Sequence, residues 1–274
     1  MFQKRKLWTG ISSIAFTAGA LTLSACGAEG ETEGEGAEGE GAVIASEGEG
    51  EGYSEGEGES EGEGAAASGD PADDDAAYLH QLGLIRGHLI AFLELYRAGA
   101  YDMALKHVKH PGDEIYADLE SALAAREMPG FAGELAALSE AATSRSETME
   151  AAYDDVITAV QGHGPGAGPR ETLLAVSKIA ETAADEFYIG VDYNGAVIEP
   201  HEYQDAYGFL TAVREMLSEL STDDINASEA VAVAHEQLDL ALDAFDGLVA
   251  ETTQGEASAI YGAAARIEIA ALGL

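Results

Sequence analysis

Residues 78–96, with the sequence YLHQLGLIRGHLIAFLELY, decide the fold of this chain. Apolar side chains in this stretch recur at spacings of three and four residues, which is the period of one face of an α-helix. Further apolar residues widen that face, so the stretch predicts a helix that is largely buried. Acidic residues before it favour an N-terminal cap, and a glycine after it favours a C-terminal stop. The residues that carry this pattern are Leu82, Ile85, Leu89, Phe92 and Tyr96 on the main face, Leu84, Ala91 and Leu95 beside it, residues 73–75 at the cap and Gly99 at the stop.

The sequence from residue 71 onward repeats this helical period. Residues 162–169, GHGPGAGP, cannot form a helix or a strand because of their glycines and prolines, and they divide the helical part into two halves. Residues 131–160 predict one long helix or two helices with a kink. The dipeptide Asn194-Gly195 between apolar-alternating flanks predicts a small hairpin or an ordered loop. The sequence therefore predicts an all-α fold, an up-and-down helical bundle of four or more helices.

Acidic residues are distributed unevenly along the chain. The 274 residues include 13 Lys and Arg against 51 Asp and Glu, a formal net charge of −38, and residues 27–70 hold 15 of these acids without any Lys or Arg. This Gly- and Glu-rich segment buries too little apolar area to offset its ordering entropy, so it predicts a disordered acidic tether. Residues 71–274 then form one helical domain with a net charge of −26. A field of that sign excludes nucleic acid as a partner.

The first 26 residues predict a secretory signal, with a positive start at residues 4–6 and an apolar core at residues 7–23. The end of this segment, LSACG at residues 23–27, resembles the lipobox of bacterial lipoproteins, in which the cysteine becomes the lipidated first residue. Cys26 is the single cysteine of the chain. The resemblance implies a lipid anchor at Cys26, and Gly27 after it implies delivery to the outer membrane with the domain facing the periplasm. The alternatives are a transmembrane anchor and an ordinary cleaved signal with a chance cysteine.

Two histidines and a carboxylate surround a predicted helix break in the run HVKHPGDE. We expect the helix to end at His110-Pro111, because the residue before a proline avoids the helical region. His107 and His110 lie three residues apart and His110 and Glu114 lie four apart, spacings at which helical side chains converge. His88 on the preceding helix would approach them in an antiparallel pair, and imidazole with carboxylate suits zinc, copper or iron. The alternative is that His107 and His110 are surface or capping residues and that His88 is a core residue bonded to a backbone carbonyl.

A second group of polar residues opens a helix in the run EPHEYQDAY. Glu202 and Asp205 lie three residues apart there, so both side chains can reach one cation. The alternative is that these acids cap the helix and interact with its dipole. Nucleophilic catalysis has no support, because the chain has no Gly-x-Ser-x-Gly turn and its cysteine is assigned to the anchor. Gly164-x-Gly166 lacks the flanking strand and helix of a nucleotide fingerprint, so we expect a protein that is not an enzyme.

Two stretches of the predicted domain carry short motifs, GHL followed by HxxHPxxExY within residues 87–116, and NGxVIxxxEYQD within residues 194–205. These motifs resemble those of periplasmic helical domains associated with bacterial iron uptake, namely the imelysin-like lipoproteins and the extracytoplasmic helical region of high-affinity iron permeases. The resemblance implies an α-helical bundle that faces the periplasm and binds a transition metal, iron, through histidines and carboxylates. The chain departs from the Gly-x-His-x-x-Glu motif of imelysins, because Ala91 stands three residues after His88.

The sequence therefore predicts a membrane-anchored periplasmic lipoprotein that binds or delivers a metal ion in metal uptake. Iron is the preferred candidate for this ion, and copper or zinc are the next candidates. The expected partners are the membrane, through the lipid anchor, and an iron permease or another envelope protein. The alternative function is that of a structural or interaction lipoprotein of the cell envelope with no metal site. The expected metal ligands are His88, His107, His110, Glu114, Glu202 and Asp205.

Overall fold

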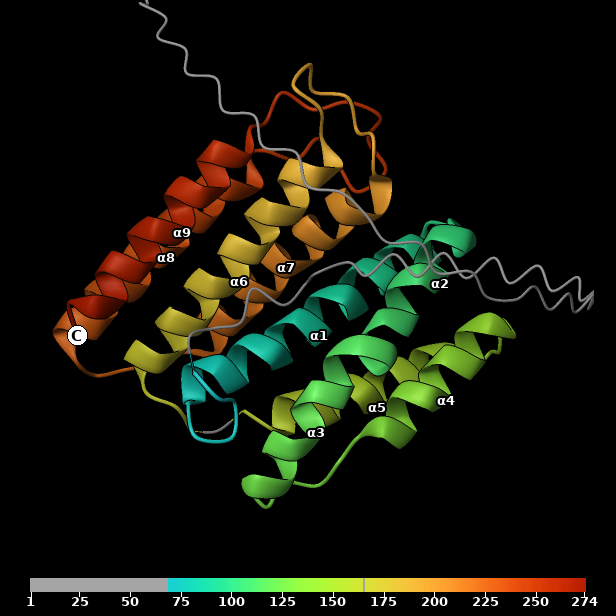
Figure 1. Cartoon of the computed structure of the whole chain (residues 1–274), viewed down its shortest axis with the longest axis horizontal. Helices are drawn as coiled ribbons and strands as arrows, with labels where there is room; N and C mark the ends of the chain where they lie inside the picture. Colours follow the sequence, from blue (N-terminus) through green and yellow to red (C-terminus); the bar gives the residue numbers. More distant parts are fainter. Residues whose placement is uncertain (1–68, 165) are drawn as a thin grey trace, which may run out of the picture. The chain divides into compact units, whose positions relative to one another are not determined.

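The computed structural model describes residues 69–164 and 166–274, and this part of the chain is built from helices (Figure 1). The prediction of an all-α bundle is confirmed. The predicted signal segment, Cys26 and nearly all of the predicted tether lie outside the described residues. The elements are α1 Asp75–Arg97, α2 Tyr101–His110, a π-helical turn Pro111–Ile115, α3 Tyr116–Ala125, α4 Ala132–Thr143, α5 Met149–Gly162, α6 Pro169–Gly190, α7 Pro200–Glu219, α8 Ile225–Leu242 and α9 Ala257–Leu272.

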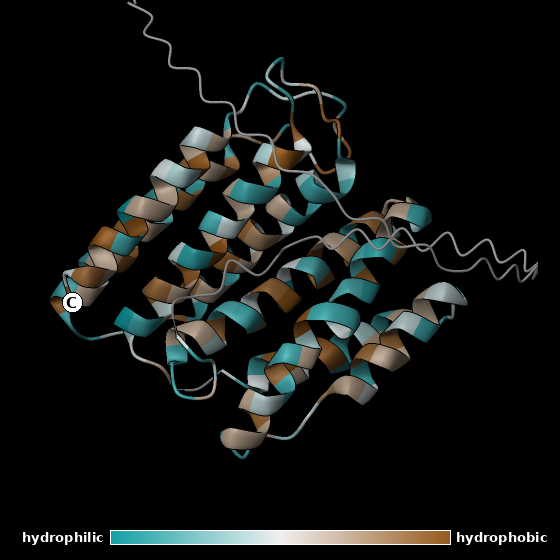
Figure 2. Cartoon of the chain, viewed as in Figure 1, coloured by the Kyte–Doolittle hydropathy of each residue, from teal (hydrophilic) through white to brown (hydrophobic). Residues whose placement is uncertain are grey.

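Helix α1 lies in the middle of the described domain, between α2 on one side and α6 and α7 on the other (Figure 1). Helices α8 and α9 pack side by side and cover α6, while α4 and α5 form a pair next to α2 and α1. The outer helices carry both hydrophilic and hydrophobic residues, as amphipathic helices around a core do (Figure 2). Among the described helices, none combines the length and the apolar character that a membrane crossing needs.

The beginning and end of α1 follow the predicted signals. The Asp74 carboxylate accepts hydrogen bonds from the backbone N–H groups of Ala76 and Ala77, at 2.8 and 3.0 Å, and so caps the first turn. Gly99 follows the helix with φ +82°, a left-handed conformation that glycine adopts without steric penalty. Between these ends α1 is buried along nearly its whole length, as the wide apolar face predicted.

The predicted helix break at His110-Pro111 is wrong. His110 has helical dihedral angles, φ −48° and ψ −50°, and the chain continues through Pro111–Ile115 as a π-helical turn directly into α3. The backbone N–H of Tyr116 donates to the carbonyl oxygen of Pro111, one residue further back than in an α-helix. This wider turn accommodates a proline, which has no N–H to donate. His107 and His110 therefore stay on one continuous helix, a single turn apart.

The structure decides between the alternatives that the sequence left open for two further segments. Residues 131–160 contain two helices, α4 and α5, separated by a turn in which Arg145 has φ +53°. The Asn194-Gly195 segment is an ordered loop, with isolated antiparallel bridges Val191 to Val197 and Ala196 to Thr252. The loop and the segment before α9 therefore stay attached to each other.

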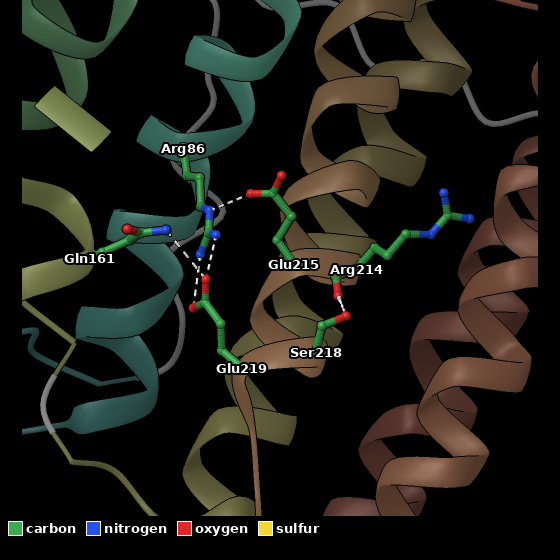
Figure 3. Close-up of polar contacts among 6 residues, drawn as sticks. All are labelled: Arg86, Gln161, Arg214, Glu215, Ser218 and Glu219. Carbon is green, nitrogen blue, oxygen red and sulfur yellow. Dashed lines mark hydrogen bonds and ion pairs between the residues drawn. The ribbon is translucent and has the colours of Figure 1, made fainter. Parts of the chain in front are cut away.

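A buried arginine connects α1 to α7 (Figure 3). The guanidinium of Arg86 donates to Glu215 Oε2 at 2.7 Å and to both carboxylate oxygens of Glu219 at 2.6 and 3.1 Å. The Arg86 side chain is 7% exposed, whereas the two glutamates are 45% and 53% exposed. Burial lowers the pKa of Arg86, but the two carboxylates outweigh burial and raise it. The buried arginine therefore depends on partners that are about half exposed to water.

Removing the charge of both partners should destabilise the protein more than removing the arginine itself. Glu215→Gln with Glu219→Gln leaves a buried guanidinium without a counter-charge, and we expect it to lower the free energy of unfolding by about 2 kcal/mol. Arg86→Met, which removes the buried charge, should cost about 1 kcal/mol. Denaturant unfolding measures both values, with Arg214→Met as the control, since the Arg214–Asp239 pair is exposed and should contribute below about 0.5 kcal/mol. A larger loss for Arg86→Met than for the double glutamine variant would contradict this reasoning.

Candidate metal centre

A close crossing of α1 and α7 brings the central residues of the site together. A Cβ atom on Gly208 would lie 2.4 Å from the carbonyl oxygen of Gly87, and one on Gly87 would lie 2.9 Å from the backbone nitrogen of Phe209. The two backbones are therefore in direct contact, which only glycines permit. His88 follows Gly87 on α1, and Asp205 lies one turn before Gly208 on α7, so the crossing places these two side chains opposite each other.

Asp205 is the centre of the arrangement and is fully buried. Its Oδ1 atom lies 2.6 Å from Nδ1 of His88 and 2.7 Å from Nδ1 of His107, and both histidines are also fully buried. Its Oδ2 atom lies 3.4 Å from Nε2 of His201, one helical turn earlier on α7. Burial raises the pKa of Asp205, but the charges and hydrogen bonds of His88 and His107 hold it well below its usual range. The centre of the site is therefore an ionised carboxylate.

Four of the seven histidines of the chain form a ring around this carboxylate. The distances between neighbouring imidazole centroids are 5.4 Å from His88 to His110, 4.8 Å from His110 to His201, 4.5 Å from His201 to His107 and 6.4 Å from His107 to His88. The potential ligand atoms form two groups, one made by His88, His110 and Asp205 and the other by His107, His201 and Asp205. Within each group, the ligand atoms lie within 4.8 Å of one another. These groups can hold a metal ion.

Gln204 fixes the orientation of the His107 ring. Nε2 of His107 lies 2.9 Å from Oε1 of Gln204, and the Gln204 amide donates in turn to Sδ of Met103 at 3.4 Å. Because the amide oxygen only accepts, Nε2 carries a proton and Nδ1 is directed toward Asp205. Histidines that ligate metals are held in the same way, with the second ring nitrogen donating to an oxygen. His107 is therefore oriented as a metal ligand would be.

His201 provides an uncharged imidazole at neutral pH. Burial lowers the pKa of His201 to about 4, Asp205 opposes this shift, and the other three imidazoles of the ring reinforce it. A neutral imidazole has a lone pair available for a metal ion. His201 and His110 are also the partly exposed members of the ring, so the cluster reaches solvent on their side.

The structure brings together four of the six predicted metal ligands, His88, His107, His110 and Asp205. Glu202, which follows His201 in the sequence, is buried but belongs to neither of the two groups. Glu114 is exposed in the π-helical turn and also belongs to neither.

Sequence reasoning missed His201 and Gln204 as parts of this site. His201 lies four residues before Asp205, the spacing at which side chains share a helix face. The sequence therefore indicated that His201 could lie beside Asp205. Gln204 had no such signal, because its role depends on His107 and Met103 of another helix.

Two further histidines have structural partners away from the ring. Nε2 of His80 lies 3.3 Å from Oγ1 of Thr182, and His163 is bonded to the backbone carbonyl oxygens of Ala159 and Pro129. Nε2 of His80 and both ring nitrogens of His163 therefore have partners inside the helical packing. No protein-family model, curated protein or solved structure matches the chain. Its function is therefore inferred from the chemistry of the ring.

Proposed function

We propose that this chain is a membrane-anchored, non-enzymatic lipoprotein of the periplasm that binds or delivers a transition metal ion in metal uptake. The observation that carries the proposal is the ring of His88, His107, His110 and His201 around the buried Asp205. Imidazole and carboxylate ligands together suit iron, copper and zinc. Iron comes first, because the two sequence motifs that resemble iron-uptake domains contain His107, His110 and Asp205.

The burial of the ring favours a metal over a purely structural ion-pair network. Two imidazolium rings on one carboxylate would leave a positive charge in a fully buried place, and desolvating such charges is expensive. A metal ion bound by neutral imidazoles instead uses the lone pairs that the ring turns inward. The low pKa of His201 supplies one such lone pair. His107 would supply another once a metal ion replaces the proton that Nδ1 donates to the Asp205 carboxylate at 2.7 Å.

The position of the ring also suits delivery of the ion. His88, His107 and Asp205 are fully buried, whereas His110 and His201 are partly exposed. We propose that an ion enters and leaves on the side of His110 and His201. A lipid anchor at Cys26 would keep this site near the membrane, where an iron permease or another envelope protein could receive the ion.

One observation favours the alternative function, an interaction lipoprotein without a metal site. Large apolar side chains are exposed around the ordered loop, among them Tyr193 at 97% and Tyr188 at 72% exposure. Ile198 in the same loop is also exposed. Exposed apolar groups of this kind occur at docking surfaces. A test of metal binding separates the two functions.

Metal ions should stabilise the folded protein. The full chain, purified without a histidine tag and freed of metal, is melted with Fe(II) in the absence of oxygen and with Cu(II) or Zn(II). At one hundred times the dissociation constant, binding adds about 2.7 kcal/mol, which corresponds to a rise in melting temperature of roughly 5 to 10 °C. His107→Gln with His110→Gln should abolish the rise, whereas His235→Gln, on α8 and outside the ring, should keep it.

Two results would overturn this proposal. An unchanged melting temperature with all three metals would favour the interaction lipoprotein. A rise that the His107→Gln and His110→Gln variant retains in full would place binding elsewhere on this acidic chain.

A further inference from the structure

We infer that the ring binds two metal ions rather than one, with the Asp205 carboxylate bridging them. This inference rests on the proposed function and extends it to the number of ions and to the carboxylates that accompany them. The histidines divide into two groups, His88 with His110 and His107 with His201, and the groups have Asp205 in common. Each group thus offers two imidazoles and one carboxylate oxygen to an ion of its own.

The spacing within each group fits one ion. Ligand atoms around a single ion lie at most about 4.2 Å apart, which is twice a metal–ligand distance of about 2.1 Å. The ligand atoms of each group already lie within 4.8 Å of one another, so small side-chain rotations would bring them onto the ion. The imidazole centroids are 5.4 Å apart in the first group and 4.5 Å apart in the second.

The position of Asp205 fits a bridge. Its Oδ1 atom is 2.6 Å from His88 of the first group and 2.7 Å from His107 of the second, while Oδ2 is 3.4 Å from His201. One carboxylate therefore contacts imidazoles of both groups. Centres with two metals hold their ions about 3.5 to 4 Å apart, a distance that a carboxylate can span.

Charge balance calls for further carboxylates, and two buried glutamates are the candidates. Two divalent ions add four positive charges, of which Asp205 neutralises one, and an excess of this size is expensive inside a protein. Glu202 is 6% exposed and lies three residues before Asp205 on α7. Glu186 on α6 is 5% exposed. With neutral imidazoles, the three carboxylates together would leave the whole centre a net charge of +1.

Glu186 lies on the face of α6 that packs against α7. A Cβ atom on Gly190 of α6 would lie 2.7 Å from the backbone nitrogen of Tyr203 of α7, so this face of α6 meets α7. Glu186 lies one turn before Gly190 and shares that face. Helices α1, α2, α6 and α7 would then each contribute to the centre, as facing helices do in bundle proteins that hold two metal ions.

Stoichiometry on the full chain tests the inference. The metal-free protein is titrated with Fe(II) without oxygen by calorimetry, and the bound iron is counted by mass spectrometry after desalting. We expect two ions per chain for the unchanged protein and for the His235→Gln control. His88→Gln with His110→Gln and His107→Gln with His201→Gln should each retain one ion, and Glu186→Gln with Glu202→Gln should weaken the second ion at least tenfold.

X-ray absorption on the unchanged, iron-loaded protein gives a second readout that does not depend on the folding of any variant. An iron–iron distance of about 3.5 to 4 Å supports the inference. One ion per chain without an iron–iron distance overturns it while leaving the proposed function in place. Absence of bound iron, with no bound copper or zinc in parallel titrations, overturns both.

Discussion

Asp205→Asn should lower the affinity for Fe(II) by about 100-fold or more, the largest effect that we expect from a single side chain of the ring. Replacing groups that merely orient metal ligands already costs 10- to 100-fold in affinity. Asp205 does more than orient, because it contacts His88 and His107 and approaches His201. The asparagine has nearly the same shape but lacks the negative charge that a cation requires.

Calorimetric titration of the metal-free protein measures this loss of affinity. Asp239→Asn is the matched control, because Asp239 is an exposed aspartate of α8 that pairs with Arg214, and it should bind Fe(II) with unchanged affinity. Circular dichroism of the metal-free variants separates lost binding from lost folding. Asp205→Asn with unchanged affinity and a normal helical spectrum would show that the ion is not bound at Asp205.

The components of the ring were visible in the sequence to different degrees. Helical spacing within one segment is local information, so the presence of His107 and His110 in one site was predicted, although they belong to different ligand groups. The convergence of α1, α2 and α7 is not local, because it depends on the contact between Gly87 and Gly208. No spacing of apolar residues reveals which two glycines meet, so the antiparallel approach of His88 to the other histidines was predicted only in general terms.

The wrong prediction at His110-Pro111 has a physical reason of the same kind. The preference of a residue before proline for extended conformations is a local tendency, and burial of Ile115 and Tyr116 against the core outweighs it. The π-helical turn resolves the conflict by widening the helix instead of ending it. Rotation through this turn leaves Glu114 in solvent, which is why the predicted pairing of His110 with Glu114 does not form a group.

Gly208→Ala should both destabilise the fold and damage the ring. The new Cβ atom would lie 2.4 Å from the carbonyl oxygen of Gly87 and 3.2 Å from Cβ of Ala91. A backbone carbonyl inside a helix cannot rotate away, so α1 as a whole must shift from α7. Overpacking of this kind costs about 1 to 3 kcal/mol, and the better helix propensity of alanine, about 1 kcal/mol, offsets part of it only where there is space.

A shift of α1 also carries His88 away from Asp205, because His88 follows Gly87 directly. We therefore expect a melting temperature lower by roughly 4 °C or more and an Fe(II) affinity reduced at least tenfold. Gly133→Ala on α4 is the control, since a Cβ atom there meets nothing within 4 Å, and it should leave both quantities unchanged or raise the melting temperature slightly. Thermal melts and calorimetry of the two variants give the comparison. If Gly208→Ala keeps both the stability and the affinity of the unchanged protein, the contact between α1 and α7 does not position the ring.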